Sequence, residues 1–578
     1  MIDKYIEKLN HDRNVKFIPI CKAENEYHGT VYIDNERLEL KISFSNQFPL
    51  EFPDIYLENK KRVYPHVGKN NKICLFDDSS ILIQTDNPYS ILLDAFDRAI
   101  EILSISPKNP EYNTEILKEF NAYWEEESTV FLYMITPQYT SNTYKVLDSV
   151  LIDNRIILSD SIELSLSVFE RCSNKKIDKS SSIETLFIKI NRNVIIPIQD
   201  TYSWKWLRLF ILKNITSSQK EQFKNFLKRK VKSFLKLIVL MIPGMEHDIP
   251  VGFYINRKSN HQQTFETIVD CKVKPISIKM IDYDYMTYKT GISSSLRNKK
   301  ILLLGCGSVG GYIAANLCQS GICNIDILDN DVLSIENVHR HILGFNDAVK
   351  IEYKAELMRK YIEEHYPFVN VDSMNFVNRD VREFLKTPER LKCYDVIVSA
   401  LGEPTINLEI NKILNNKGIQ VPLVVCFNEP YSIGGHVIAT NMKNGGCLQC
   451  LYTDLTSDEI VPFRASFVKE NQTFSKSISG CAGTYVEYSA LDAQQTALLA
   501  CRLCLEIIDN KNESSTLLSW YGDSSKLINN GFFTSDYYDN ITSSEKYCGI
   551  IRKTFDKNKE CPLCKMNHSI YVLKYCPK

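Results

Sequence analysis

Four cysteines of this chain stand in two pairs, each with two residues between the thiols. The pairs are Cys447 with Cys450, in GGCLQCLY, and Cys561 with Cys564, in KECPLCKMNH. A two-residue spacer lets both thiolates of a pair reach one metal ion, and two such pairs complete the tetrahedral ligand set of a structural zinc site. The spacing therefore predicts a zinc clasp that ties the C-terminal segment to the preceding domain.

A second chemical feature is a glycine-rich turn that follows an apolar run. The stretch ILLLGCGSVGGY, residues 301–312, has Gly305, Gly307 and Gly310 directly after four apolar residues. A buried strand, a glycine turn and a helix together hold the pyrophosphate of a dinucleotide or the phosphates of ATP, because backbone N–H groups at the helix start point at the ligand. The glycines alone leave both ligands open.

Charged residues after the second expected strand distinguish the two ligands. Asp329 ends the run NIDILDND, where its carboxylate can accept hydrogen bonds from the ribose of either ligand. Asp331, Asn337 and Arg340 follow, and Lys354 lies one helix segment further. Hydride transfer needs no cation cluster at this place, whereas an enzyme that forms an acyl adenylate must neutralise a triphosphate and the departing pyrophosphate. The cluster favours ATP.

Cys481 is a candidate nucleophile. It follows Ser479 and Gly480, shortly before the helical pattern SALDAQQTALL. A thiolate near a helix N-terminus is competent to take an activated acyl group. Other cysteines lie in or beside apolar runs, which predicts packed thiols without reactivity: Cys306, Cys318, Cys393, Cys426, Cys501 and Cys504.

The elements that must position these residues divide the chain into three expected domains. Residues 1–127 show a helix, alternating strands and a second helix with one apolar stripe, an α+β unit. Residues 128–295 mix strand-like runs with one lysine-rich helical pattern over 217–240, and the sequence assigns them no chemistry. Residues 296–578 alternate strands and helices, which predicts a doubly wound, Rossmann-like parallel sheet within an α/β fold.

Charge and hydropathy limit the classes of partner. The chain of 578 residues has 69 Lys and Arg against 70 Asp and Glu, so no global field attracts nucleic acid or an anionic membrane. The first residues lack the apolar core of a signal peptide, and the run FLKLIVLMIPG is too short to span a bilayer. We therefore expect a cytoplasmic protein whose cysteines are thiols, metal ligands and nucleophiles rather than disulfides.

The combined motifs GCGSVGG, DILDND and ENVHRH resemble the nucleotide site of the superfamily of ubiquitin-activating, molybdopterin-synthase-activating and ThiF-like enzymes, over about residues 296–510. The resemblance implies that ATP and magnesium bind here. It also implies that Arg340 and Lys354 contact the ATP phosphates and that Asn337 helps to hold them. Lys350 is the alternative to Lys354.

One residue departs from the pattern of that superfamily. Many relatives have a magnesium-assisting aspartate after the strand that corresponds to DVIVSA, whereas this chain has Gly402 followed by Glu403. Glu403 either substitutes for that aspartate or is a carboxylate at a helix N-terminus, beside Pro404.

The N-terminal domain carries a second resemblance. FPLEFPDIYL, VYPHVGKNNKICLF and SILLDAFDRAIEIL resemble, in order, the proline-rich turn, the active-site segment and the following helix of a ubiquitin-conjugating enzyme. By that resemblance Cys74 is the catalytic cysteine. The usual His-Pro-Asn is replaced by His66 followed by Val67, so support for an oxyanion must come from Asn70, Asn71 or backbone amides.

A conjugating-like part followed by an activating-like part resembles the fused activating and conjugating enzymes of bacterial CBASS anti-phage systems. That family implies adenylation of the C-terminus of a partner cGAS/DncV-like nucleotidyltransferase, or CD-NTase. It further implies relay of the acyl group through Cys481 and then Cys74, conjugation to amines of target molecules, and a homodimer of adenylating domains.

Three other functions remain open at this stage. A nicotinamide-dependent oxidoreductase would share the glycines and Asp329, but the sequence shows no acid–base constellation for hydride transfer. A non-catalytic interaction protein would keep the folds for binding only, as the missing asparagine and Gly402 favour. An activator of a sulfur-carrier protein would leave the N-terminal domain without a role.

Overall fold

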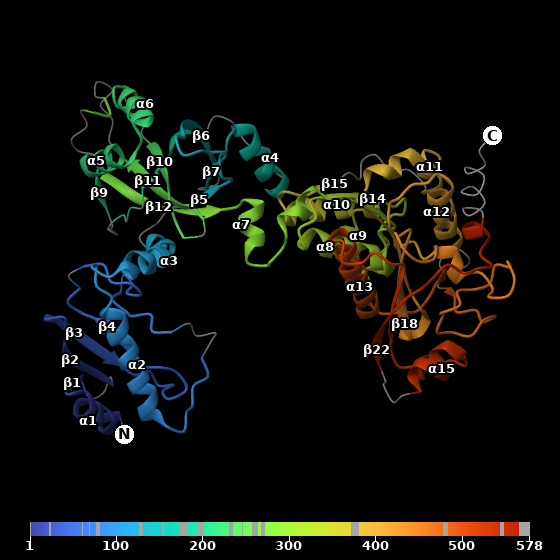
Figure 1. Ribbon diagram of the computed structural model, residues 1–578, viewed down its shortest axis with the longest axis horizontal. Helices are drawn as coiled ribbons and strands as arrows, with labels where there is room; N and C mark the ends of the chain where they lie inside the picture. Colours follow the sequence, from blue (N-terminus) through green and yellow to red (C-terminus); the bar gives the residue numbers. More distant parts are fainter. Residues whose placement is uncertain are drawn as a thin grey trace, which may run out of the picture. The chain divides into compact units, whose positions relative to one another are not determined.

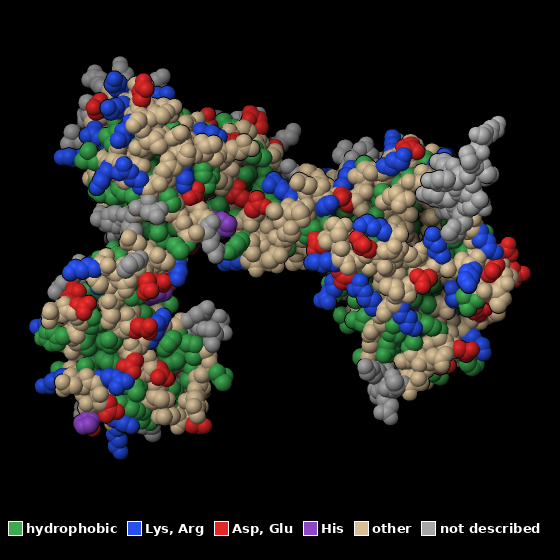
Figure 2. Space-filling model, viewed as in Figure 1, with side chains coloured by type: hydrophobic (Ala, Val, Ile, Leu, Met, Phe, Trp, Pro, Cys, Tyr) green, Lys and Arg blue, Asp and Glu red, His purple; other side chains and the backbone are tan. Residues whose placement is uncertain are grey.

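The computed structural model divides into two compact units, residues 1–167 with 177–282 and residues 168–176 with 283–578 (Figure 1). On the face shown in Figure 2, cationic and anionic side chains are interspersed. No helix in the described part of the chain is long and apolar enough to cross a bilayer. The described residues are 2–21, 25–60, 62–68, 70–76, 81–126, 131–152, 155–173, 182–192, 194, 196, 201–229, 235–245, 247–256, 264–266, 272–371, 381–477, 484–543 and 548–565.

The N-terminal domain is a four-stranded antiparallel meander with helices, as the sequence predicts. Alternation puts Leu38, Leu40 and Ile42 on the buried side of β3. The second helix begins where the Asn87 side chain accepts a hydrogen bond from the Ser90 N–H, and its apolar stripe covers the sheet. The elements are α1 (Ile2–Arg13), β1 (Lys16–Cys21), β2 (Glu26–Ile33), β3 (Glu36–Ser43), β4 (Asp54–Leu57), α2 (Pro88–Leu103) and α3 (Pro110–Glu126).

The middle part of the chain is built on a mixed sheet. Its strands pair in the order β11-β10-β8-β6-β7-β5-β12-β9. Strand β11 also pairs with β12, so the sheet closes on itself. The elements are β5 (Phe131–Met134), β6 (Tyr144–Ile152), β7 (Arg155–Leu158), α4 (Ile162–Ser173), β8 (Ser182–Lys189), β9 (Tyr202–Ser203), α5 (Trp204–Asn214), α6 (Ser217–Leu227), β10 (Leu235–Ile242), β11 (Ile249–Asn256) and β12 (Lys272–Met280).

The predicted helix over residues 217–240 is wrong in its second half. Helix α6 ends at Leu227, and residues 235–242 form strand β10. Strand β10 pairs with β8 on one side and β11 on the other, and the side chains of residues 237–242 are all buried. A continuous apolar run buried on both faces has no periodicity that separates strand from helix. Lys228 and Arg229 follow the last residue of α6.

The C-terminal unit confirms the predicted doubly wound α/β fold. Its sheet has the order β15-β14-β13-β16-β17-β18-β21-β22, parallel from β15 to β17 and antiparallel beyond. The elements are α7 (Tyr283–Tyr288), β13 (Lys300–Leu304), α8 (Ser308–Gln319), β14 (Asn324–Leu328), α9 (Phe345–Ala348), α10 (Lys354–His365), β15 (Asn370–Val371), α11 (Val381–Leu385), β16 (Val396–Ser399), α12 (Pro404–Asn416), β17 (Leu423–Asn428), β18 (Gly434–Thr440), β19 (Lys476–Ser477), β20 (Thr484–Tyr485), α13 (Ala490–Ile508), β21 (Thr516–Tyr521), α14 (Ser525–Asn529), α15 (Asp536–Thr542) and β22 (Gly549–Thr554).

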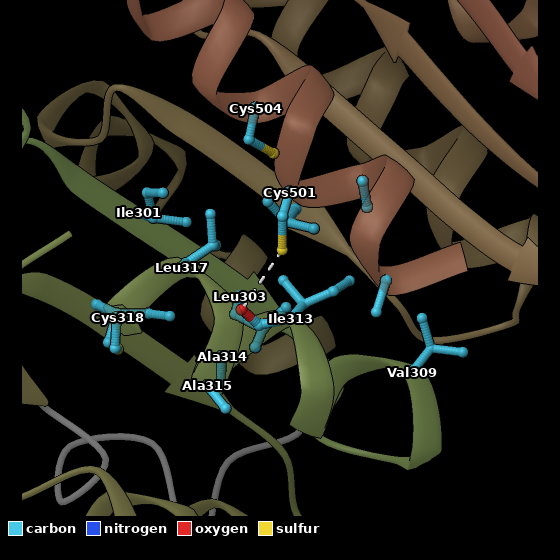
Figure 3. Close-up of a cluster of buried hydrophobic side chains, with 14 of the residues drawn as sticks. Ile301, Leu303, Val309, Ile313, Ala314, Ala315, Leu317, Cys318, Cys501 and Cys504 are labelled. Atoms are coloured by element: carbon cyan, nitrogen blue, oxygen red, sulfur yellow. Dashed lines mark hydrogen bonds between the residues drawn. The ribbon is translucent and has the colours of Figure 1, made fainter. Parts of the chain in front are cut away.

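Helices α8 and α13 pack together in the core of this unit, and thiols fill part of their contact. Figure 3 shows Cys501 of α13 above Ile313 of α8, and the Cys501 thiol donates to the Ile313 carbonyl oxygen at 3.7 Å. Burial raises the pKa of the Cys501 thiol well above its ordinary value and that of Cys426 to about 12. Burial of this kind makes neutral packing groups of the cysteines for which the sequence predicts packing: Cys306, Cys318, Cys426, Cys501 and Cys504.

For Cys393 the prediction of a packed thiol is wrong, because its side chain is exposed. It ends a short 3₁₀ helix, Pro388–Cys393, just before the buried strand β16, so the apolar run that follows it belongs to the strand alone.

Helix α3 contributes to the core of the middle sheet. Phe120 and Trp124, one turn apart, stack with ring centroids 5.6 Å apart and pack among residues of β8, β10, β11 and β12. The Trp124 indole N–H donates to the Ile276 carbonyl oxygen at 3.0 Å. The helix that closes the predicted first domain thus fills the core of the middle domain.

Trp124→Ala should lower the free energy of unfolding of this core by about 3–5 kcal/mol, since it removes a buried ring and leaves a carbonyl without its donor. Hydrogen exchange of the β10–β12 amides would measure the loss. Phe131→Ala is the control, because that side chain is 45% exposed and should change stability little. A loss below about 1 kcal/mol for Trp124→Ala would contradict the assignment of α3 to this core.

Candidate active sites

The turn between β13 and α8 requires glycine at two of its positions, 305 and 310. At Gly310 a Cβ atom would lie 1.9 Å from the Gly305 carbonyl oxygen, and Gly305 itself has a φ of +89°. A Cβ at Gly307 would meet nothing within 4 Å, so the space beside this residue is open. The turn brings α8 close to the carboxyl end of β13 and leaves its N-terminal N–H groups facing an opening.

Asp329 is fixed on this turn. Its carboxylate accepts hydrogen bonds from the backbone N–H groups of Cys306, at 2.6 Å, and Asp331, at 2.8 Å. Burial raises the pKa of Asp329, while the charge of Lys354 and the two N–H donors act in the opposite direction. A carboxylate has about four acceptor positions, so Asp329 still has capacity for ribose hydroxyls.

Of the two candidate lysines, the structure brings Lys354 to the turn. Its side chain is 11% exposed, and its Nζ atom lies 2.9 Å from the Asp331 carboxylate. Lys354 begins helix α10, and its backbone N–H donates to the Asp331 carbonyl oxygen at 2.8 Å. Lys350 is 48% exposed and pairs with Asp347 at 2.8 Å.

Arg340 and Asn337, both in the motif ENVHRH, lie together. The Nε and Nη2 atoms of Arg340 donate to the Asn337 Oδ1 atom at 3.2 and 3.0 Å. The Nη1 atom donates to the Val486 carbonyl oxygen at 3.4 Å, and the guanidinium lies 5.3 Å from the centre of the Tyr488 ring. Tyr488 also contacts the start of α8, because the Ser308 and Tyr488 hydroxyls are 2.6 Å apart.

Sequence reasoning missed Ser308, Tyr488 and His341. The His341 Nδ1 atom accepts from the Leu343 N–H at 3.1 Å, so its Nε2 atom must carry the proton that it donates to the Cys306 carbonyl oxygen at 2.9 Å. Burial lowers the pKa of His341, which keeps it neutral. His341 could have been identified from the sequence, since it is the last residue of the motif ENVHRH. Tyr488 could not, since only the fold brings it to the turn.

Glu403 lies at the N-cap position of α12, and its side chain makes no capping hydrogen bond. It is 59% exposed and pairs with Arg382 at 3.7 Å. Gly402 has a φ of +69°, which favours glycine over aspartate at this position. Of the two alternatives from the sequence, the geometry favours a solvated carboxylate at a helix start.

The structure brings the four paired cysteines into one buried cluster, with all four sulfur atoms within 4.8 Å of one another. The Cys447 sulfur lies 3.8 Å from that of Cys450 and 3.8 Å from that of Cys561, and the Cys450 sulfur lies 3.5 Å from that of Cys564. The Asn558 backbone N–H donates to the Cys450 sulfur at 3.3 Å. Four soft donors in this arrangement form a closed metal-binding site.

Cys481 lies outside the described residues, between β19 and β20. These two strands pair antiparallel, with Ser477 opposite Thr484. The residues that follow β20 contact the glycine-turn site, through Val486 and Tyr488 as above.

Cys74 is an exposed thiol on the segment that follows β4. Its backbone N–H donates to the His66 carbonyl oxygen at 2.7 Å, and its thiol donates to the Phe76 carbonyl oxygen at 3.9 Å. Of the two candidate oxyanion donors, Asn70 accepts the Lys72 N–H with its side-chain oxygen at 3.0 Å, and Asn71 adopts a φ of +65°. Both residues thus shape the bend that leads into Cys74.

The glycine turn, the aspartate and the two cations lie at the carboxyl end of a doubly wound sheet, which is the arrangement expected of an E1-like domain. The antiparallel meander with an exposed cysteine before α2 is the arrangement expected of an E2-like domain. Two family models agree: the ThiF family matches residues 284–518, and the prokaryotic E2 family B matches residues 21–133. The two matched ranges do not overlap, and each lies in the part of the chain where the sequence resemblance to that kind of enzyme was found.

Several known proteins are similar to this chain. The ATP-dependent ubiquitin transferase-like protein Cap2 of Pseudomonas aeruginosa is 23% identical over 57% of this chain and 55% of that protein, so the chain spans little more than half of that relative. The protein of the same name from Vibrio cholerae is 22% identical over 80% of this chain and 83% of that protein. Among solved structures, Escherichia coli MccB with MccA-N7isoASN matches over 47% of this chain and 68% of that chain, at 15% identity and a TM-score of 0.33.

Ser308→Ala and Tyr488→Phe each remove the same hydrogen bond, so each should lower the free energy of unfolding of the C-terminal unit by about 1 kcal/mol. The double variant should lose no more than either single variant, because the bond can be lost only once. Urea denaturation of the three variants would measure this. Losses that add up in the double variant would show that the two hydroxyls do not bond to each other.

Proposed function

We propose that this chain is an ATP-dependent ubiquitin transferase-like enzyme, which activates the C-terminal carboxylate of a protein partner and transfers it to an amine. The observation that carries the proposal is the pair of cations, Lys354 and Arg340, held beside the open glycine turn before any ligand arrives. Such preorganised charge stabilises a triphosphate and its leaving group without reorganisation during the reaction. The names of the two Cap2 relatives support the same activity.

In the first step a carboxylate oxygen of the partner attacks the α-phosphorus of ATP. The bond from that phosphorus to the bridging oxygen breaks, and pyrophosphate leaves with both bonding electrons. The α8 N–H groups next to Gly307 face the phosphates, and Asp329 accepts from the ribose. Arg340 and Lys354 balance the charge that grows on the pyrophosphate.

In the next steps two thiolates carry the acyl group. The Cys481 thiolate attacks the carbonyl carbon of the adenylate and AMP leaves; the Cys74 thiolate then attacks the thioester and releases Cys481. An amine of the target finally attacks the Cys74 thioester and loses a proton, which gives an amide and a free thiol. Each exchange preserves the activation that ATP supplied until the amide forms.

The partner proposed here is the C-terminus of a CD-NTase, which the resemblance to the fused enzymes of CBASS systems implies. Conjugation of that C-terminus to target amines would prime anti-phage signalling. By the same resemblance the adenylating domains pair as a homodimer. The support for this choice is the joint presence of a ThiF-family domain and a prokaryotic E2 domain in one chain.

Zinc is the metal proposed for the four-cysteine cluster. A tetrahedral zinc ion with four Zn–S bonds of about 2.3 Å separates its sulfur atoms by about 3.8 Å. The sulfur–sulfur distances of 3.5 to 3.8 Å fit that geometry, and the Asn558 N–H can stabilise one of the thiolates. The ion would be structural, since four protein ligands leave no position for a substrate.

Magnesium is proposed as the companion of the triphosphate. Described carboxylates beside the turn are those of Asp329, which is held by two N–H donors, and Asp331, which is 68% exposed and paired with Lys354. Asp331 is the better candidate for a metal-bound water, because Glu403 points to Arg382 instead.

The purified chain should contain about one zinc ion per molecule by mass spectrometry of its metals. Cys561→Ser should lose that ion and lower the stability of the C-terminal unit, because the clasp joins two segments that are far apart in the sequence. Cys393→Ser, at an exposed cysteine outside the cluster, is the matched control and should keep the ion. A wild-type protein that folds without a metal would contradict the proposal.

To test the relay, the protein is incubated with ATP, magnesium and a CD-NTase that has its native C-terminus. The products are then separated on gels with and without a thiol reductant. The wild type should give a thiol-sensitive adduct; Cys74→Ala should stop it on Cys481, and Cys481→Ala should give none. Pyrophosphate release is measured in parallel, and Cys393→Ala is the control for thiol loss.

Two outcomes of that experiment would contradict parts of the proposal. Pyrophosphate release without an adduct would keep the adenylation and remove the relay. Neither pyrophosphate nor adduct, with a set of CD-NTase partners, would favour a protein that only binds.

A further inference from the structure

His66 connects the Cys74 segment to helix α3. The His66 backbone, at a φ of +59°, directs its carbonyl oxygen to the Cys74 N–H at 2.7 Å. On the other side, the His66 Nδ1 atom lies 2.8 Å from a Glu119 carboxylate oxygen, and its Nε2 atom lies 3.2 Å from a Glu115 carboxylate oxygen. The same residue thus contacts the proposed nucleophile through its backbone and α3 through its side chain.

Both ring nitrogens of His66 face carboxylates, which accept hydrogen bonds and cannot donate them while ionised. Two such contacts require a proton on each nitrogen, so the geometry fits the imidazolium form. The hydrogen bond to Glu119, and then that to Glu115, raises the pKa of His66 against the opposing effect of burial. The pKa values of Glu119 and Glu115 are lowered, for Glu119 mainly by His66 and for Glu115 by Lys118 and then His66.

Helix α3 carries the two glutamates on one face and anchors itself with another. Glu115 and Glu119 are one turn apart, and Tyr112, one turn earlier, donates its hydroxyl to the Val63 carbonyl oxygen at 2.6 Å. Phe120 and Trp124 lie in the core of the middle sheet. The helix therefore joins residues 63–66, just upstream of Cys74, to the core of another domain.

We infer that the charged His66, held between Glu115 and Glu119, is a positioning residue: it fixes the Cys74 segment to helix α3 and, through α3, to the middle domain. The inference rests on the proposed function, in which Cys74 carries the acyl group. His66 touches no reacting atom in this proposal. It acts through its backbone carbonyl, which accepts the Cys74 N–H, and through its side chain, which binds helix α3. The chain lacks the usual Pro-Asn after this histidine, and in this inference the contact of His66 with α3 fixes the segment instead.

The three side chains define the pH range in which this device holds. The folded pKa of His66 is raised, so its contribution to stability is fully present below the unfolded pKa and is lost as the pH rises through the folded value. The pKa values of the glutamates are lowered, so their contribution is present above the unfolded value and is lost as the pH falls through the folded one. Lys118 pairs with Glu115 at 2.7 Å, and the buried Tyr123 lies against Glu119 and keeps its proton, because burial raises its pKa.

The test uses the full chain with His66→Gln, His66→Arg and Glu119→Gln. Arginine keeps a permanent cation with several donors and does not titrate, whereas glutamine loses the charge. Glu111→Gln is the matched control, since Glu111 is an exposed glutamate on the same helix. The readouts are the pH dependence of acyl transfer from Cys481 to Cys74, the rate of iodoacetamide labelling of Cys74, and the NMR titration of His66, assigned by the signal that His66→Gln removes.

Wild-type transfer should be fastest near neutral pH and fall as His66 loses its proton, and the NMR titration should show the same midpoint. His66→Gln should slow transfer about tenfold at neutral pH, and Glu119→Gln should move the His66 titration to lower pH. His66→Arg should restore most of the rate and abolish the fall at higher pH. Glu111→Gln should behave as the wild type.

A His66 that titrates at or below the ordinary histidine pKa, or a His66→Gln variant with wild-type transfer and labelling, would overturn the inference. Equal loss in His66→Gln and His66→Arg would also overturn it, because only the ring would then matter. If no thioester forms on Cys481 in any variant, the proposed function fails. The NMR titration and the labelling of Cys74 still decide the inference in that case.

Discussion

The close approach of α8 to the end of β13 is the constraint on which the activating site depends. A side chain at Gly310 would collide with the Gly305 carbonyl oxygen at 1.9 Å, so the turn exists only with glycine at this position. The approach places the N-terminus of α8 at the carboxyl end of β13. There the Asp329 carboxylate binds the turn through the Cys306 N–H. A side chain at this position would push α8 away from β13 and disturb the turn that the Asp329 carboxylate binds.

The two cations, Arg340 and Lys354, differ in the charge of the groups that hold them. Arg340 donates to the neutral oxygens of Asn337 and Val486, the latter at a long 3.4 Å, and hydrogen bonds to an anion are shorter and stronger. Lys354 is more tightly held, since its partner Asp331 is charged. In the proposed function, Arg340 is therefore the cation whose partners would change most on triphosphate binding, and Val486, which follows β20, is one of those partners.

Local patterns could be predicted from the sequence, and contacts between distant segments could not. The glycine turn, the meander, α2 and the four-cysteine cluster all follow from spacing within short stretches, because a repeat of two or 3.6 residues or a pair of cysteines is visible locally. Strand β10 was assigned to a helix because its run of buried side chains lacks a period. Tyr488 and Ser308, and likewise His66 and Glu119, meet only after the chain has folded, and no local signal marks them.

The exposed Cys74 and the buried cysteines of α8 and α13 show how the fold separates chemistry from packing. Burial raises the pKa of Cys501 well above its ordinary value, so its thiolate is not formed, although the residue type is the same. Cys74 is exposed and its backbone N–H bonds to the His66 carbonyl oxygen, while its neighbours Ile73 and Leu75 are buried in the N-terminal core. The His66 end of the segment needs a rigid partner of its own. Helix α3 meets that need, because its aromatic face is buried in one domain while its glutamates hold the imidazolium of another.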